Sequence, residues 1–258
     1  MTLTFLGTGT SGGVPAVGCQ CEVCTSKDPH DNRLRTSAMV ETASTRIIID
    51  CGPDFRQQML RVPFRKIDAV LISHIHYDHV GGIDDLRPFC SAEYPKLLDI
   101  DIYADKPTAE ALTHNMPYCF TPNSYPGIPK LQLHTLKHHV PLTIGDISVV
   151  PFWVNHGSMP ITAFRIGPLA YITDMKTIDD EELKYAEGAV ILVANALRFH
   201  GGHYSHQLVD DAIQLARRIG AKQTFLVHAS HDMGLHEQVQ KMLPQDVRMA
   251  YDNQIIQF

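Results

Sequence analysis

The stretch His74-Ile75-His76-Tyr77-Asp78-His79 directly follows residues 69–73, whose apolar run over 69–72 predicts a buried strand. It brings three imidazoles and one carboxylate to the point where that strand ends. Because a loop need not keep the side-chain alternation of a strand, these groups can converge on one cation. Nitrogen and oxygen donors together suit Zn²⁺ or another divalent transition metal, such as Mn²⁺ or Fe²⁺. The stretch therefore predicts a metal centre rather than a set of solvated loop histidines.

Three further polar residues stand at the ends of other expected strands. They are His156 and Asp174, after the apolar or alternating ranges 145–154 and 169–173, and His228, which ends the range 223–228. Each of them alone is compatible with a hydrogen-bonded polar residue at a strand end. Together they indicate that several strands deliver ligands to one edge of the fold.

The motif His74-x-His76-x-Asp78-His79, followed by Val80-Gly81-Gly82, resembles the signature of the metallo-β-lactamase superfamily. The resemblance implies an α/β fold of four layers, αββα, in which two mixed β-sheets are flanked by helices. It also implies a dinuclear centre at one edge of this sandwich. One metal would take His74, His76 and His156, the other would take Asp78, His79 and His228, and Asp174 would bridge them.

Asp50 closes the apolar run Ile47-Ile48-Ile49. In the superfamily that the motif resembles, an aspartate at this place orients the ligands without binding metal, so the same role is implied here. A polar residue that caps a strand-to-loop turn would occupy the same position. Both interpretations of Asp50 stay open at this point.

Three of the six cysteines form the cluster Cys19-x-Cys21-x-x-Cys24. Such closely spaced thiols in a long chain indicate a metal rather than a disulfide scaffold. Together with the segment 228–231, the cluster resembles the PhnP-like phosphodiesterases, which hydrolyse phosphoribosyl cyclic phosphate. That resemblance implies a separate structural zinc on Cys19, Cys21, Cys24 and His231, carried by an insertion at about 18–31 of one domain spanning 1–258. A redox-sensing thiol cluster is the alternative.

His206 stands at the expected start of a helix over 207–219. It resembles the histidine that protonates the leaving group in the phosphodiesterase branches, so we expect His206 and the ligand Asp78 to act in catalysis. A helix N-terminus also attracts anions such as phosphate. An ordinary polar residue at a helix start is the alternative. His203 and His200, in the preceding glycine-rich loop, are weaker candidates for contact with substrate.

The pattern Gly7-x-Gly9-x-x-Gly12 matches a dinucleotide-binding fingerprint as text. A helix should follow such a loop, yet here the chain continues through Pro15 into the cysteine cluster. The pattern therefore predicts a tight turn with close approach of the backbone.

Composition limits the class of protein. With 258 residues, 44% of them hydrophobic, the chain fits one α/β domain, and its 15 histidines suit metal or proton chemistry. The net charge of −6 argues against a long nucleic acid as partner. Since neither a signal peptide nor a long apolar stretch is evident, we expect a cytoplasmic protein without membrane contact. The resemblance suggests a homodimer.

The remaining periodicities complete an alternation of strands and helices. Further strands are expected over 2–6, 37–42, 45–50, 101–104, 131–136, 161–166 and 190–194, with two short ones at the end of the chain. Further helices are expected over 54–62, from about Gly82, and over 107–116, 179–187 and 235–243. The proline-rich stretch 117–130 predicts a loop without regular structure.

These features predict a metal-dependent phosphodiesterase that hydrolyses a small cyclic or short ribose or nucleotide phosphodiester. Two divalent ions, Zn, Mn or Fe, would serve the active site, with one structural Zn elsewhere. Alternatives are a thioester or lactone hydrolase similar to glyoxalase II, a nuclease similar to those that process transfer-RNA 3′ ends, and a metal-stabilised interaction module.

Overall fold

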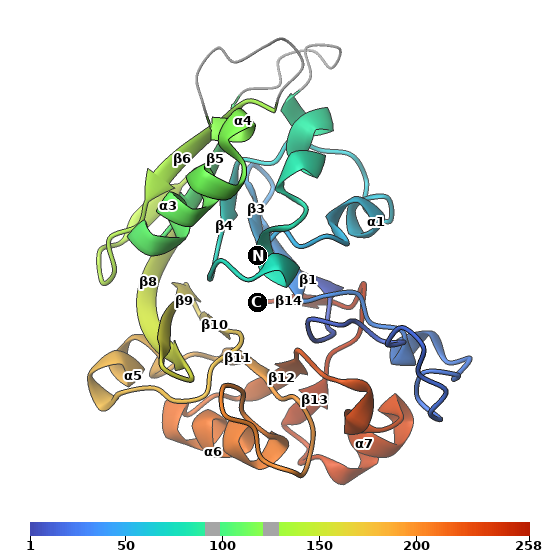
Figure 1. The fold of residues 1–258 in the computed structure, drawn as a ribbon. Coiled ribbons are helices and arrows are strands. Elements are labelled where there is room, and N and C mark those ends of the chain that lie inside the picture. The colour runs from blue at the N-terminus through green and yellow to red at the C-terminus, as the bar shows by residue number, and fades with distance from the viewer. Residues whose placement is uncertain (91–98, 121–128) are drawn as a thin grey trace.

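Two seven-stranded β-sheets pack face to face in the computed structural model, which describes residues 1–90, 99–120 and 129–258 (Figure 1). The first sheet has the order β14 (Ile255–Gln257), β1 (Thr2–Gly7), β2 (Ser37–Glu41), β3 (Arg46–Ile49), β4 (Ala69–Leu71), β5 (Ile100–Ala104), β6 (Leu131–Thr135). The second has the order β13 (Val247–Met249), β12 (Gln223–Val227), β11 (Ile191–Asn195), β10 (Leu169–Ile172), β9 (Met159–Ile166), β8 (Ile147–His156), β7 (Leu142–Ile144).

Both sheets are mixed, as expected. Strands β3 to β6 are parallel to one another in the first sheet, and β10 to β13 in the second, whereas the other neighbours pair antiparallel. Parallel neighbours end at the same edge of a sheet. The segments that follow β3 and β4, and those that follow β10 and β12, therefore leave each sheet on a common side.

Helices cover the outer face of each sheet, which completes the expected αββα sandwich (Figure 1). Over the first sheet lie α1 (Phe55–Met59), α2 (Tyr77–Val80), the 3₁₀ helix η2 (Ile83–Cys90), α3 (Lys106–Asn115) and α4 (Pro117–Phe120). Over the second lie α5 (Asp180–Ala186), α6 (Val209–Ile219) and α7 (His236–Met242). Two short 3₁₀ helices, η1 (Pro29–Asp31) and η3 (His231–Met233), lie in connecting segments.

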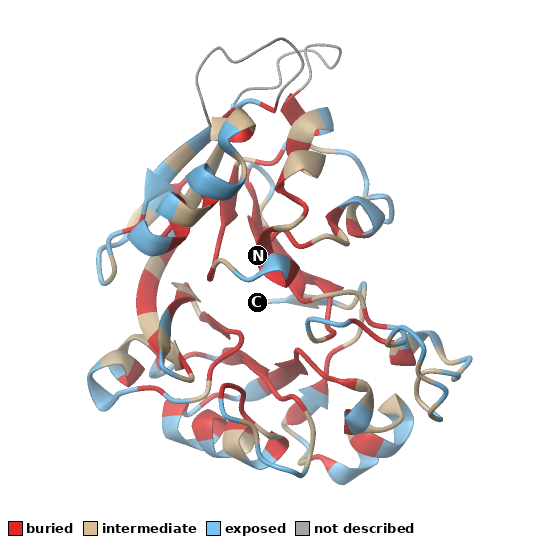
Figure 2. Ribbon diagram, viewed as in Figure 1, coloured by how far each residue is buried: buried red, intermediate tan, exposed pale blue. Residues whose placement is uncertain are grey.

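Strand β3 shows why the layers form. Ile47 and Ile49 belong to the apolar core between the sheets, whereas Ile48 belongs to the core beneath the outer helices. Alternate side chains of a strand point to opposite faces, so an uninterrupted apolar run requires both faces to be covered. The buried strands between exposed outer helix faces follow this pattern in both halves (Figure 2).

Helix α6 forms where the sequence indicates one, although it begins two residues later than expected. Its apolar stripe, including Ala212 and Leu215, is buried against the second sheet. Asp210 and Asp211 lie in its first turn, and Gly220 ends the helix in the left-handed conformation, with φ of 76°. Consequently the expectation that His206 opens this helix is wrong, because His206 lies in the loop before it.

Two other expectations also need correction, and one strand was not expected. Asp78 and His79 lie in the short helix α2 rather than in a loop. Residues 117–120 form the helical turn α4, since prolines fit the first turn of a helix, while 121–128 lie outside the described residues. Strand β7 was not expected.

Among the described residues, no helix is long and apolar enough to cross a membrane.

Glycines hold α2 against the end of β3. A Cβ atom on Gly52 would lie 2.0 Å from the carbonyl oxygen of Asp78, and one on Gly82 would lie 2.0 Å from that of Gly52. No side chain fits between backbones this close. The two glycines therefore set how closely the histidine motif approaches the strand.

We expect Gly52→Ala to lower the free energy of unfolding by about 1–3 kcal/mol, because α2 must move to admit the methyl group. Gly12→Ala is the matched control, since a Cβ atom there meets nothing within 4 Å. Thermal and urea unfolding of both variants measure the difference. Equal stability of the two variants would contradict this account of Gly52.

Candidate metal centre

Three site residues turn the chain sharply where a strand ends. Asp50, Asp174 and His228 have φ values of 61°, 56° and 57°, in the left-handed region that non-glycine residues rarely adopt. They follow β3, β10 and β12. Such strained positions gather at functional sites, where the surrounding structure holds them in place. The turns keep all three side chains buried at the junction of the two sheets.

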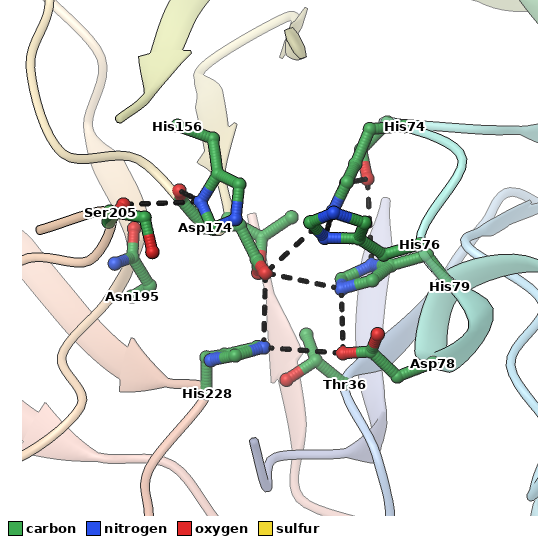
Figure 3. Close-up of polar contacts among 12 residues, drawn as sticks. Thr36, His74, His76, Asp78, His79, His156, Asp174, Asn195, Ser205 and His228 are labelled. Atoms are coloured by element: carbon green, nitrogen blue, oxygen red, sulfur yellow. Dashed lines mark hydrogen bonds and ion pairs between the residues drawn. The ribbon is translucent and has the colours of Figure 1, made fainter. Parts of the chain in front are cut away.

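The ligands expected from sequence lie together at this junction (Figure 3). The carboxylate oxygen Oδ2 of Asp174 lies 3.1 Å from His228 Nε2, 3.3 Å from His79 Nε2 and 3.9 Å from His74 Nε2. Asp78 Oδ2 is 3.2 Å from His79 Nε2 and 3.6 Å from His228 Nε2. Asp174 thus has a central position, which is where a bridging ligand would lie.

The donor atoms divide into two groups. One contains His74, His76 and His156, and the other contains Asp78, His79, Asp174 and His228, with the ligand atoms of each group within 4.8 Å of one another. This division matches the two ligand sets that the resemblance implies. A third group joins His206 to His156 and Asp174.

Two buried hydrogen-bond networks fix the ring orientations. His156 Nδ1 lies 2.5 Å from the carbonyl oxygen of Asp174 and 3.1 Å from that of Ser205, so it donates and its Nε2 is left for a metal. On the other side, Asp50 Oδ2 lies 2.7 Å from His79 Nδ1. Ser73 donates to Asp50 from both its hydroxyl and its backbone N–H at 2.8 Å. Asp50 therefore contacts a ligand and does not join either donor group.

The site has the electrostatics of a cation site. Burial disfavours the charged ring, but Asp174 and Asp50 raise the pKa of His79 well above its usual value. Similarly, Asp174 and Asp78 raise the pKa of His228 to about 9 against the effect of burial. Without a cation these rings hold protons that neutralise the buried carboxylates. A bound cation would take over this charge and release the protons.

Buried ring nitrogens without hydrogen bonds also indicate that the donor set fits divalent ions. His206 Nδ1 and His228 Nδ1 are buried atoms for which the described residues provide no hydrogen-bond partner, and the Nε2 atoms of His79 and His228 lie 3.1–3.6 Å from carboxylate oxygens of Asp78 and Asp174 without a hydrogen bond. Buried polar atoms are normally hydrogen-bonded or bound to a metal. Imidazole and carboxylate donors at this spacing would hold Zn²⁺, Mn²⁺ or Fe²⁺.

The cysteine cluster forms a second group of possible ligands. Cys19 Sγ and Cys21 Sγ lie 3.6 Å and 3.4 Å from His231 Nδ1, and Cys24 completes a set within 4.8 Å. The backbone N–H of Cys24 and the His231 ring lower the pKa of Cys21 to about 6, which favours a thiolate. A Cys₃His set without an open position suits a structural zinc. His231 follows His228 by three residues, so this segment contacts both groups.

A cavity of about 450 Å³ opens onto the ligands, and four of its lining residues are His76, His156, Asp174 and His228. His203 and His206 also line it, whereas His200 lies in a neighbouring groove beside Arg198. His203 is therefore placed to contact a substrate in the cavity, as expected, whereas His200 is not.

Sequence reasoning missed two parts of the site. The glycine-rich turn Thr10–Gly13 lines the cavity, because backbone hydrogen bonds join Thr8 and Thr10 to Ala229, next to His228. A Cβ atom on Gly9 would lie 2.8 Å from the carbonyl oxygen of Arg33, which supports the expected close approach. Ser73, whose hydroxyl donates to Asp50, is the second part of the site that the sequence did not reveal. Its position directly before His74 could have indicated a role in supporting the ligands.

Comparison with known proteins identifies the class. Residues 45–229 match the family that is described as the β-lactamase superfamily domain. A crystal structure described as a new diphosphatase from the PhnP family is 38% identical, covers 100% of this chain and 96% of its own, and superposes with a TM-score of 0.92. The chain thus belongs to the β-lactamase superfamily and, within it, to the PhnP family. It has the metallo-β-lactamase fold, and its groups of candidate ligands suit divalent metal ions.

Other relatives are more distant or longer. A Porphyromonas gingivalis protein named octanoyltransferase is 42% identical over 98% of this chain and 50% of its own length. A ribonuclease Z of Bradyrhizobium diazoefficiens is 40% identical over 33% of this chain and 23% of its own. The chain spans about half or less of the length of these curated relatives. The YhfI structure of Bacillus subtilis, 18% identical over 99% of both chains with a TM-score of 0.75, shares the fold.

We expect wild-type protein to contain about three metal ions per chain and Cys21→Ser about two, since the Cys₃His group is separate from the histidine and aspartate ligands. Elemental analysis of the purified proteins measures the content. Cys119→Ser is the control, because Cys119 is buried away from both groups. Two ions in both wild type and Cys21→Ser would refute a structural zinc.

Proposed function

We propose that the chain is a phosphodiesterase that hydrolyses a small phosphodiester. The observation that carries the proposal is a cavity in which two groups of metal ligands meet an additional imidazole, His206. Bound divalent cations would supply hydroxide at neutral pH and neutralise charge on the phosphoryl oxygens. The protein's own residues position the ligands and move a proton.

Asp50 and Ser73 keep the His79 ring fixed, and the carbonyl groups of Asp174 and Ser205 do the same for His156. Rings held in this way need no reorganisation when substrate enters. Preorganised groups of this kind account for much of the rate enhancement in enzymes. The network of Asp50 therefore supports catalysis without touching substrate.

His206 is the candidate acid. Burial, and then the neighbouring His228, lower its pKa to about 3. A phosphate anion beside the ring favours the imidazolium and opposes both effects. His206 would then give its proton to the leaving oxygen as the phosphorus–oxygen bond breaks. Its ring centre lies 4.7 Å from that of His156 and 4.8 Å from that of His228, next to a candidate ligand of each metal group.

The proposed substrate is small. Among the described residues that line the cavity, none is lysine or arginine, and the chain carries a net charge of −6. A long nucleic acid needs many cationic contacts, which this surface does not offer. A disubstituted diphosphate is a second candidate, because the PhnP-family relative is described as a diphosphatase. Each phosphorus of such a compound resembles a diester in charge and substitution.

We expect the metal-loaded protein to hydrolyse bis(p-nitrophenyl) phosphate or a nucleoside 2′,3′-cyclic phosphate at least tenfold faster than a thioester or a lactone. Chelation should abolish the activity, and Asp174→Asn should lower it by two or more orders of magnitude. Release of p-nitrophenolate measures turnover of the aryl diester, and chromatography of the products measures turnover of the other three substrates. Faster thioester or lactone turnover would reject the phosphodiesterase in favour of an acyl hydrolase.

His206→Ala should lower kcat by about 10²–10⁴-fold for a diester with an alkyl leaving group. The loss should be below about tenfold for a p-nitrophenyl leaving group, which departs without a proton. Metal content must remain that of wild type. Equal losses for both leaving groups would show that His206 is not the acid.

A further inference from the structure

The ring of Tyr204 stands in solvent at the rim of the metal cavity. Tyr204 is 84% exposed and yet lines the same cavity as His76 and His206. A Cβ atom on Gly157 would lie 3.5 Å from a ring carbon of Tyr204. Gly157 directly follows the ligand candidate His156, so the tyrosine ring lies next to the metal ligands.

Hydrogen bonds hold the backbone of the segment that carries Tyr204. His203 Nδ1 accepts hydrogen bonds from the N–H groups of Ser205 at 3.3 Å and His206 at 3.2 Å. Arg198 donates to the carbonyl oxygens of residues 200–202 at 2.9–3.2 Å. The His203 ring stacks on the Tyr204 ring with centroids 5.1 Å apart. A fixed aromatic face costs little ordering entropy when a ligand binds to it.

The chemistry around Tyr204 favours a flat, neutral ligand. The cavity lining beyond the ligand candidates consists mainly of uncharged groups, including the turn Thr10–Gly13, Leu197 and Ser230. The guanidinium of Arg198 is engaged with Asp232 and the loop carbonyls. A second charged phosphate at the rim would therefore lack a cationic side chain, whereas an aromatic face is available for a planar ring.

We propose that Tyr204 forms a stacking platform for a nucleobase, so that the substrate is a nucleotide phosphodiester rather than a phosphate of a bare sugar. This inference rests on the proposed function and specifies its substrate class. Every base offers a π-face, so such a platform selects nucleotides without selecting one base. Tyr204 acts as a specificity residue that contacts the part of the substrate that does not react.

The test compares adenosine 2′,3′-cyclic phosphate with methyl riboside 2′,3′-cyclic phosphate, which lacks the base. In Tyr204→Ala and Tyr204→Leu, the ratio of kcat/KM for the first over the second substrate should fall about tenfold. The change should lie in KM, with kcat within about twofold. Tyr204→Phe keeps the aromatic face and should keep the ratio. Leu60→Ala, 71% exposed and outside the cavity, is the control.

Binding separates this proposal from the hydrolytic one. Calorimetry on the metal-loaded protein should show that adenosine 5′-monophosphate binds about tenfold tighter than ribose 5-phosphate, and that Tyr204→Ala removes the difference. If both affinity results are found but no phosphodiester is hydrolysed, the proposed reaction is wrong, whereas the proposed stacking of a nucleobase on Tyr204 is supported. Equal affinity of the two ligands for wild type, or equal losses for both in Tyr204→Ala, would overturn the platform. The platform would also be overturned if Tyr204→Leu and Tyr204→Phe gave the same ratio of kcat/KM for the two cyclic phosphates.

Discussion

The burial of three carboxylates at the junction of two sheets is the constraint on which the rest of the structure depends. Asp50 and Asp174 are almost completely inaccessible, and Asp78 is 8% exposed. A buried negative charge is costly unless positive charge or hydrogen-bond donors surround it. Here the donors are Ser73 and the rings of His79 and His228. These partners come from both sheets, so charge neutralisation and the packing of the two halves depend on each other.

The topology delivers those partners to one place. The first sheet contributes Asp50 after β3 and the histidine motif after β4. The second contributes His156 as the last residue of β8, and Asp174 and His228 after β10 and β12. Strands that end on a common side require only a sharp turn at each end. Left-handed backbone at Asp50, Asp174 and His228 provides that turn. The strain is tolerated because each side chain is held by several partners.

Sequence predicted the parts that depend on local patterns. Apolar runs located the buried strands, and the helical stripe of 207–219 located α6, because burial imposes these periodicities directly. The ligand candidates could be named because each follows such a run. In contrast, β7 and the cavity contact of the turn Thr10–Gly13 depend on neighbours distant in the chain. The helical state of Asp78 and His79 likewise depends on Gly52, whose close approach no local pattern reveals.

Several histidines that lie outside both metal groups have structural partners. His138 stacks on Trp153 with centroids 3.4 Å apart and lies 3.0 Å from the hydroxyl of Thr162. The backbone N–H of Thr162, in β9, donates to the carbonyl oxygen of Ser73, which links the second sheet to the residue that supports Asp50.

Elsewhere, His139 pairs with Glu182, and His134 pairs with Asp101. Imidazole is both a flat packing surface and a hydrogen-bonding group, which suits such positions. The abundance of histidine therefore reflects metal chemistry at one edge of the sandwich and packing around it. Only position in the fold separates the two uses.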